Sequence, residues 1–85
     1  MTTVTLRYWA AARDAAGVAE QVIVADTLSA ALAQAGDEAV RDRLAMVLQR
    51  SSFLINGDPV GRRAADTVEL TDGAIIEVLP PFSGG

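Results

Sequence analysis

The chain has 85 residues, 51% of them apolar and 21% charged, and its formal net charge at pH 7 is −4. It contains no His, Cys or Lys, so it lacks the usual general base near pH 7, a thiol nucleophile, a Schiff-base amine and the commonest transition-metal ligands, and we expect no catalytic centre, metal or cofactor of its own. The acidic balance disfavours nucleic-acid binding, and the absence of a long apolar run or a signal-peptide pattern leads us to expect a single cytoplasmic domain with no membrane contact.

The first 25 residues predict two strands with a short helix between them. Polar and apolar side chains alternate over residues 3–9, and a period of two is typical of a strand. The Ala-rich residues 10–16 predict a short helical segment that Gly17 ends. Alternation returns over residues 20–25 and predicts a second strand, joined to the first by a connection wider than a tight hairpin.

The middle of the chain predicts two helices. Thr27 is the favoured N-cap of the first helix, and Gly36 ends it. Its apolar stripe consists of Leu28, Ala31, Leu32 and Ala35. Asp37 can cap a second helix over residues 38–50, with acid in its first turn and Arg in its last, as the helix dipole prefers. The second apolar stripe consists of Val40, Leu44, Val47 and Leu48.

The segment after the helices predicts a hairpin. Residues 53–55 are a short buried strand, and Asn56-Gly57 is a strong turn signal. A brief strand is predicted near residues 60–62, followed by a loop at residues 64–67.

The end of the chain predicts one more long strand. Residues 68–70 are partly extended, and Asp72-Gly73 makes a tight turn before a strand over residues 74–79. Pro80 and Pro81 cannot donate ladder hydrogen bonds, so the sheet stops there.

Strands, then helices, then strands predict an α+β fold in which the helices lie on one face of a mixed sheet. If the first and last long strands are neighbours, the covered face carries Val4, Leu6, Tyr8, Ile76 and Val78. The helix residues expected to cover it are Leu28, Leu32, Leu44 and Val47. The opposite face has no helices left to cover it and exposes Arg7, Trp9, Ile75, Glu77 and Leu79.

Trp9 has two interpretations. Burying a Trp side chain contributes a few kcal/mol, so an exposed Trp9 beside Leu79 and Phe82 indicates a docking patch for another protein. Alternatively, Trp9 folds under the helix of residues 10–16 and belongs to the core. The pattern of residue types favours neither interpretation.

The last seven residues combine a stiff segment with a thin end. Pro80-Pro81 favours an extended path, whereas Gly84-Gly85 has no side chains to hinder entry into another protein's pocket. Because no other residue offers a strong nucleophile or base, the α-carboxylate of Gly85 is the strongest candidate for a reactive group. The alternative is an ordinary frayed terminus.

The chain resembles the ubiquitin-like β-grasp sulfur carriers, and within them the small subunits of molybdopterin synthase. The resemblance spans the whole chain, although only its last stretch is specific. The matching stretches are Tyr8-Trp9-Ala10 with Ala12-Arg13-Asp14 and Gly17, Ile55-Asn56-Gly57, Thr71-Asp72-Gly73, and Leu79-Pro80-Pro81-Phe82-Ser83-Gly84-Gly85.

This resemblance implies a β-grasp domain over residues 1–80 and a flexible Gly-Gly tail over residues 81–85. It implies that an adenylyltransferase of the ubiquitin-activating type uses ATP to adenylate the Gly85 carboxylate, and that a sulfurtransferase or other sulfur donor leaves a thiocarboxylate there. The sulfur then forms the dithiolene of the molybdenum cofactor in the large synthase subunit. The residues implied to contact partners are Trp9, Leu79, Pro80, Pro81, Phe82 and Ser83.

Three other functions stay open. The chain could be a β-grasp sulfur carrier for thiamin or cysteine biosynthesis, although the helix of residues 38–50 and Pro80-Pro81 favour the molybdopterin type. It could be a ubiquitin-like modifier whose Gly85 is conjugated to lysines of other proteins; without Lys it cannot form isopeptide chains of itself. It could also be an interaction domain with an inert tail.

Overall fold

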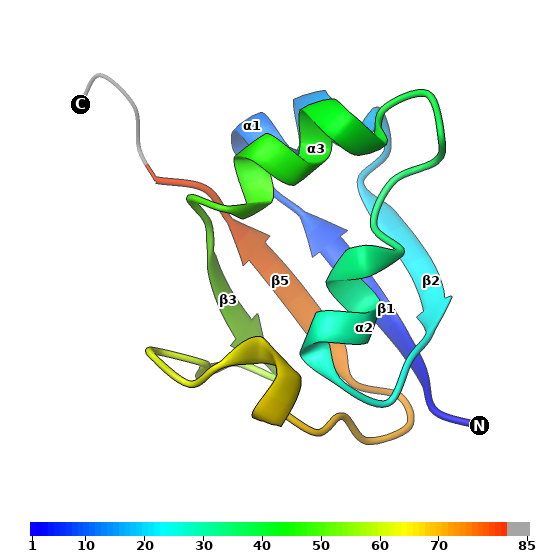
Figure 1. The fold of residues 1–85 in the computed structure, drawn as a ribbon, viewed down its shortest axis with the longest axis vertical. Coiled ribbons are helices and arrows are strands. Elements are labelled where there is room, and N and C mark those ends of the chain that lie inside the picture. The colour runs from blue at the N-terminus through cyan, green and yellow to red at the C-terminus, as the bar shows by residue number, and fades with distance from the viewer. Residues whose placement is uncertain (82–85) are drawn as a thin grey trace.

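A five-stranded mixed sheet with three α-helices makes up the computed structural model, which describes residues 1–81 (Figure 1). The strands are β1 (Thr3–Tyr8), β2 (Glu20–Val24), β3 (Ser52–Ile55), β4 (Asp58–Pro59) and β5 (Ile75–Leu79). The helices are α1 (Ala10–Ala16), α2 (Leu28–Ala33) and α3 (Arg41–Leu48), with a 3-10 turn η1 (Ala65–Thr67). The predicted α+β class and mixed sheet are confirmed.

The first and last strands are neighbours, as predicted. The strand order is β2-β1-β5-β3-β4, with β1 and β5 parallel and the other pairs antiparallel. A parallel pair needs a long crossover, and here almost the whole chain between residues 8 and 75 provides it. β5 is the middle strand of the sheet, and the last described residues, Pro80 and Pro81, follow it (Figure 1).

The core lies between the sheet and the helices, on the face that the alternation of apolar residues indicates. Each of these five predicted strand residues is at most 1% exposed: Val4, Leu6, Tyr8, Ile76 and Val78. Leu28 of α2 and Leu44 of α3 are equally buried above them, while Leu32 and Val47 are partly buried against the same core. Figure 1 shows α2 in front of the sheet and α3 near the end where the chain leaves it.

The first two helices begin where the sequence predicts. Gly17 ends α1 with φ +77°, and its N–H donates to the carbonyl oxygen of Arg13 at 2.9 Å, a left-handed C-cap that suits glycine. Thr27 caps α2, because its Oγ1 accepts from the backbone N–H of Ala30 at 3.1 Å. The helix ends at Ala33, a little before the predicted stop at Gly36.

The predicted start of the second long helix is wrong: α3 begins at Arg41, not at residue 38, and it ends at Leu48. Asp37 does not cap it. Its Oδ1 accepts from Ala39 N–H at 3.1 Å and its carbonyl oxygen from Val40 N–H at 3.2 Å, which closes a turn ahead of the helix. Asp side chains favour such local turns over helix entry.

The hairpin after α3 is shorter than predicted. Asn56 and Gly57 both have positive φ, +51° and +87°, as a two-residue hairpin turn requires. Such a turn pairs the residues directly after it, so β4 is Asp58–Pro59 and the prediction of a strand at residues 60–62 is wrong.

The segment between the hairpin and β5 contains a 3-10 turn at Ala65–Thr67 where a loop was predicted. The predicted partly extended residues 68–70 form a single bridge, between Thr27 and Glu69. The turn at Asp72-Gly73 is present, and the Asp72 carboxylate accepts from Thr3 N–H at 2.8 Å. This contact holds the entrance of β5 against the start of β1.

The predicted domain boundary near the end of the chain stays a prediction. The expected domain boundary after residue 80 depends on the tail, and Phe82–Gly85 lies outside the described residues. Within residues 1–81, no helix is long and apolar enough to cross a bilayer.

Candidate functional site

The face of the sheet that carries no helix is the candidate site, and we call it the open face. Strand register places alternate residues of β1, β2, β3 and β5 on it. Its members are Thr3, Thr5, Arg7, Trp9, Glu20, Val22, Val24, Ser52, Leu54, Ile75, Glu77 and Leu79. Val22 is 68% exposed and Val24 47%, while Ile75, Glu77 and Leu79 are half-buried. The face therefore presents apolar area to solvent, which is a feature of interaction surfaces.

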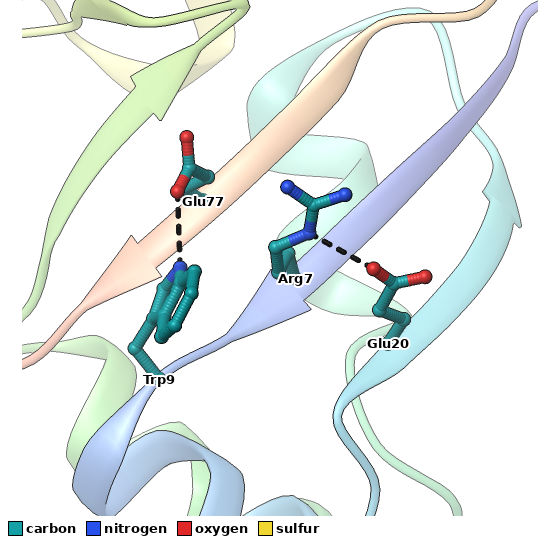
Figure 2. A network of polar contacts seen from close by, with 4 residues as sticks. All are labelled: Arg7, Trp9, Glu20 and Glu77. Carbon is teal, nitrogen blue, oxygen red and sulfur yellow. Dashed lines mark hydrogen bonds and ion pairs between the residues drawn. The ribbon is translucent and has the colours of Figure 1, made fainter.

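Trp9 lies on the open face and does not fold under α1, so the core interpretation is wrong. The indole is 45% exposed, and its Nε1–H donates to Glu77 Oε2 at 3.0 Å (Figure 2). The backbone of Trp9 is still extended, and its N–H donates to the carbonyl oxygen of Val78 at 3.2 Å, so the side chain keeps the alternation of β1. Three alanines of α1 fill the space beneath that helix: Ala12, Ala15 and Ala16.

The turn from β1 into α1 separates Trp9 from the helix. Ala10 has φ +48°, a left-handed conformation that costs about 1 kcal/mol or more for a residue with a Cβ. This bend sends α1 to the covered side of the sheet while Trp9 stays on the open face. No sequence pattern indicated a left-handed alanine at this point.

A polar row crosses the open face. Arg7 Nε lies 2.9 Å from Glu20 Oε2 on β2, and Arg7 is also the register partner of Glu77 on β5. Figure 2 shows the Arg7 side chain directed toward Glu20, while Glu77 is directed toward Trp9. An exposed pair such as Arg7–Glu20 contributes only about 0–1 kcal/mol to stability.

The base of the tail adjoins this face. Leu79 and Pro80 are half-buried and Pro81 is exposed. On the helix side, a groove of about 300 Å³ is lined by Pro80, Pro81, Ala11, Met46, Val47 and Arg50, together with Gln49. Pro80 and Pro81 thus follow β5 along the border between the open face and this groove.

The structure brings part of the predicted site together. Trp9 follows the β1 residue that pairs with Val78, so it lies beside the end of β5 and on the same face as Leu79. Pro80 and Pro81 continue directly from there. Phe82, Ser83, Gly84 and Gly85, which include the predicted reactive group, lie outside the described residues.

The sequence assigned no role to Glu77, Glu20, Val22 or Val24. Alternation placed Glu77 on the open face, but nothing in the sequence indicated its contact with Trp9. The position of Val22 and Val24 on the open face could have been predicted from the alternation of side chains along β2. Antiparallel pairing with β1 sets Val22 opposite Thr5 and Val24 opposite Thr3, which both lie on that face.

The buried polar group of the covered face is structural. The Tyr8 hydroxyl donates to Gln21 Oε1 at 2.7 Å, and Gly36 N–H donates to the same oxygen at 2.8 Å. Burial raises the pKa of Tyr8 to about 12, against a smaller opposite effect of the Gly36 backbone. The phenol therefore stays neutral near pH 7 and ties β1, β2 and the α2–α3 connection together.

No group of three or more acidic side chains within the described part of the chain is arranged to hold a metal ion.

Comparison with known proteins gives a family and a fold. The family model described as the ThiS family matches residues 6–85. No curated protein matches the sequence.

Several solved structures share the fold, among them the following three. Small archaeal modifier protein 1 from Methanosarcina acetivorans is 22% identical, with a TM-score of 0.73 over 100% of this chain and 98% of that one. The HVO 2177 protein from Haloferax volcanii is 26% identical, with a TM-score of 0.76 over 99% and 87%. A chain from the complex of subunits 1 and 2 of molybdopterin-converting factor from Helicobacter pylori 26695 is 23% identical, with a TM-score of 0.65 over 99% and 100%. The expected β-grasp arrangement is confirmed.

Proposed function

Because the chain belongs to the ThiS family, we propose that it is a sulfur carrier whose working group is the C-terminal carboxylate of Gly85. The observation that carries this proposal is the extent of the family match, which runs from residue 6 through the last glycine. The match therefore includes the Gly-Gly end, which follows the last strand, β5, in the sequence.

The chemistry follows from the state of a carboxylate. A C-terminal carboxylate has a pKa near 3.5, so at neutral pH it is ionised and a poor electrophile. An adenylyltransferase of the ubiquitin-activating type attaches AMP from ATP to Gly85 and releases pyrophosphate. A sulfur donor then displaces AMP and leaves a thiocarboxylate. This chain supplies no base, metal or cofactor; it supplies a reachable carboxylate, with Gly84 leaving the end thin.

We propose molybdopterin synthesis as the destination of the sulfur, with the large synthase subunit as the partner. The fold shared with a chain of the complex of molybdopterin-converting factor subunits supports this choice. Trp9 and Leu79 would contact the large subunit from the open face, while Pro80, Pro81, Phe82 and Ser83 would guide the tail into it. We propose that the chain acts in the cytoplasm.

A ubiquitin-like modifier is the second candidate, because small archaeal modifier protein 1 has the same fold. In that case Gly85 would form isopeptide bonds with lysines of other proteins. A sulfur carrier for thiamin or cysteine biosynthesis stays a third candidate, with the same chemistry at Gly85 and a different recipient.

Intact-mass spectrometry tests the carrier chemistry. After incubation with the adenylyltransferase, ATP and sulfide, the chain should gain the mass that corresponds to replacing one oxygen atom by sulfur. A variant lacking Gly85 should gain none while keeping the same circular-dichroism spectrum. An unchanged mass of the intact chain would overturn the carrier proposal.

The recipient is tested with the thiocarboxylated chain. Mixing it with the large synthase subunit and the pterin precursor should return the chain to its carboxylate mass and yield the dithiolene product. Conjugates with lysine-bearing proteins, formed with ATP and the adenylyltransferase, would instead favour the modifier.

A further inference from the structure

Glu77 occupies the centre of the open face. It lies on β5, the middle strand of the sheet. Its neighbours in register are Arg7 on β1 and Leu54 on β3, and Ile75 and Leu79 lie two residues before and after it on the same strand face. A protein that covers the middle of the open face therefore covers the Glu77 carboxylate.

The Glu77 carboxylate has a neutral partner and no cationic one. Its Oε2 accepts from the indole Nε1–H of Trp9 at 3.0 Å. Across residues 1–81 the structure holds one ion pair, and it joins Arg7 to Glu20 on the far side of β1. Arg7 is thus the nearest cation in register, but its Nε pairs with Glu20, and within residues 1–81 no ion pair joins it to Glu77 (Figure 2).

Water and salt screen this charge while the face is open. Covering the face removes that solvent, and a buried carboxylate without a cation is strongly destabilising. Among the surrounding side chains, Leu54, Ile75 and Leu79 have no donor, Trp9 supplies one neutral N–H, and Arg7 is paired with Glu20. The docking partner must supply the missing charge.

We propose that the open face docks on a protein surface that receives Trp9 and Leu79 in an apolar pocket and carries an Arg or Lys that pairs with Glu77. The excess of acid on this face, Glu20 and Glu77 against Arg7 alone, and the net charge of −4 of the chain match such a basic surface. This inference rests on the proposed function, which makes the large synthase subunit the partner.

The Trp9–Glu77 hydrogen bond gives Glu77 a second role. It holds the indole in one orientation before the partner arrives, and a preset aromatic anchor loses less conformational freedom on binding. Glu77 is therefore a positioning residue for Trp9 as well as the carboxylate that selects a basic partner. Its second oxygen remains available for the incoming cation.

Glu77→Gln separates charge from shape, because the amide oxygen can still accept from the indole. Calorimetric titration of the large synthase subunit of the same organism, at about 50 mM and about 300 mM salt, should show binding weakened about tenfold or more at the lower salt. The salt dependence should also be flatter than for the unchanged chain. Trp9 is the sole tryptophan, so unchanged fluorescence would confirm that the indole keeps its place.

Glu20→Gln is the matched control. It is the same substitution on the same face, at the edge strand and with a cationic partner already present, so binding should weaken less than about threefold. If Glu77→Gln binds as tightly as the unchanged chain, or if Glu20→Gln weakens binding equally, the proposal is wrong.

A chain that does not bind the large subunit at all would count against molybdopterin synthesis as its function. In that case the same two variants are titrated against the adenylyltransferase. A selective loss for Glu77→Gln would support the inference independently of the recipient, and equal binding by both variants would overturn it.

Discussion

The two faces of the sheet are built from the same strands but differ in how far their side chains are buried. On the covered face, Leu6 and Ile76 are completely buried, whereas on the open face Trp9 is 45% exposed and Val22 is 68% exposed. Burial of apolar area stabilises the fold, so the covered face carries most of the stability. The open face contributes little to folding and is available for recognition. Substitutions on the two faces should therefore have different consequences.

The largest effect on stability is expected from Leu6→Ala. Leu6 is 0% exposed in the centre of the core, and a Leu→Ala cavity costs about 2–5 kcal/mol. Thr5→Ala, one residue earlier and on the open face, should cost less than about 1 kcal/mol. Chemical denaturation measures both values. Equal destabilisation by the two variants would contradict the division between the faces.

Trp9→Ala should show the opposite pattern. Binding of the large synthase subunit should weaken by about 2 kcal/mol or more, as for a central aromatic anchor, while the free energy of unfolding changes by less than about 1 kcal/mol. Met46→Ala is the control, because Met46 is also exposed, at 69%, but lies on α3. Equal affinity of the Trp9 variant and the unchanged chain would show that the open face is not the docking site.

A smaller effect, confined to high pH, is expected from Tyr8 on the covered face. Burial raises the pKa of Tyr8 from 10.0 to about 12, so between these values the folded protein keeps a proton that the unfolded chain has released. The contribution to stability is fully present below pH 10 and is lost as the pH rises through 12. As the sole tyrosine, it can be followed by phenolate absorbance.

Tyr8→Phe completes this test. The variant should lose about 1 kcal/mol at neutral pH, because the hydroxyl no longer donates to Gln21. Its stability should also fall less steeply between pH 10 and 12. A variant that keeps the full pH dependence would show that another group titrates in this window.

Most local elements could be predicted from the sequence because their signals are local. The Thr27 cap, the Gly17 stop and the Asn56-Gly57 turn each depend on a few neighbouring residues, and each lies where predicted. The failures concern competition between local structures. Asp37 could have capped a helix or closed a turn, and it closed a turn.

The candidate site could be predicted only in part, because alternation is a local signal and the direction of the chain after β1 is not. Alternation placed Trp9 and Leu79 on one face, but the choice between surface and core for Trp9 depended on the left-handed bend at Ala10. That bend depends on how α1 packs against the rest of the fold, and no residue type near Ala10 predicts it.

The sequence by itself determined which side chains share a face, because a strand has a period of two and the apolar set marks the side that is buried. Only the tertiary structure decided which partners meet across strands. Arg7 has a carboxylate in register on each neighbouring strand, Glu20 thirteen residues away and Glu77 seventy, and it pairs with Glu20. Glu77 instead accepts a hydrogen bond from Trp9. Side-chain packing across the assembled sheet, and not the spacing in the sequence, determines which of these contacts form.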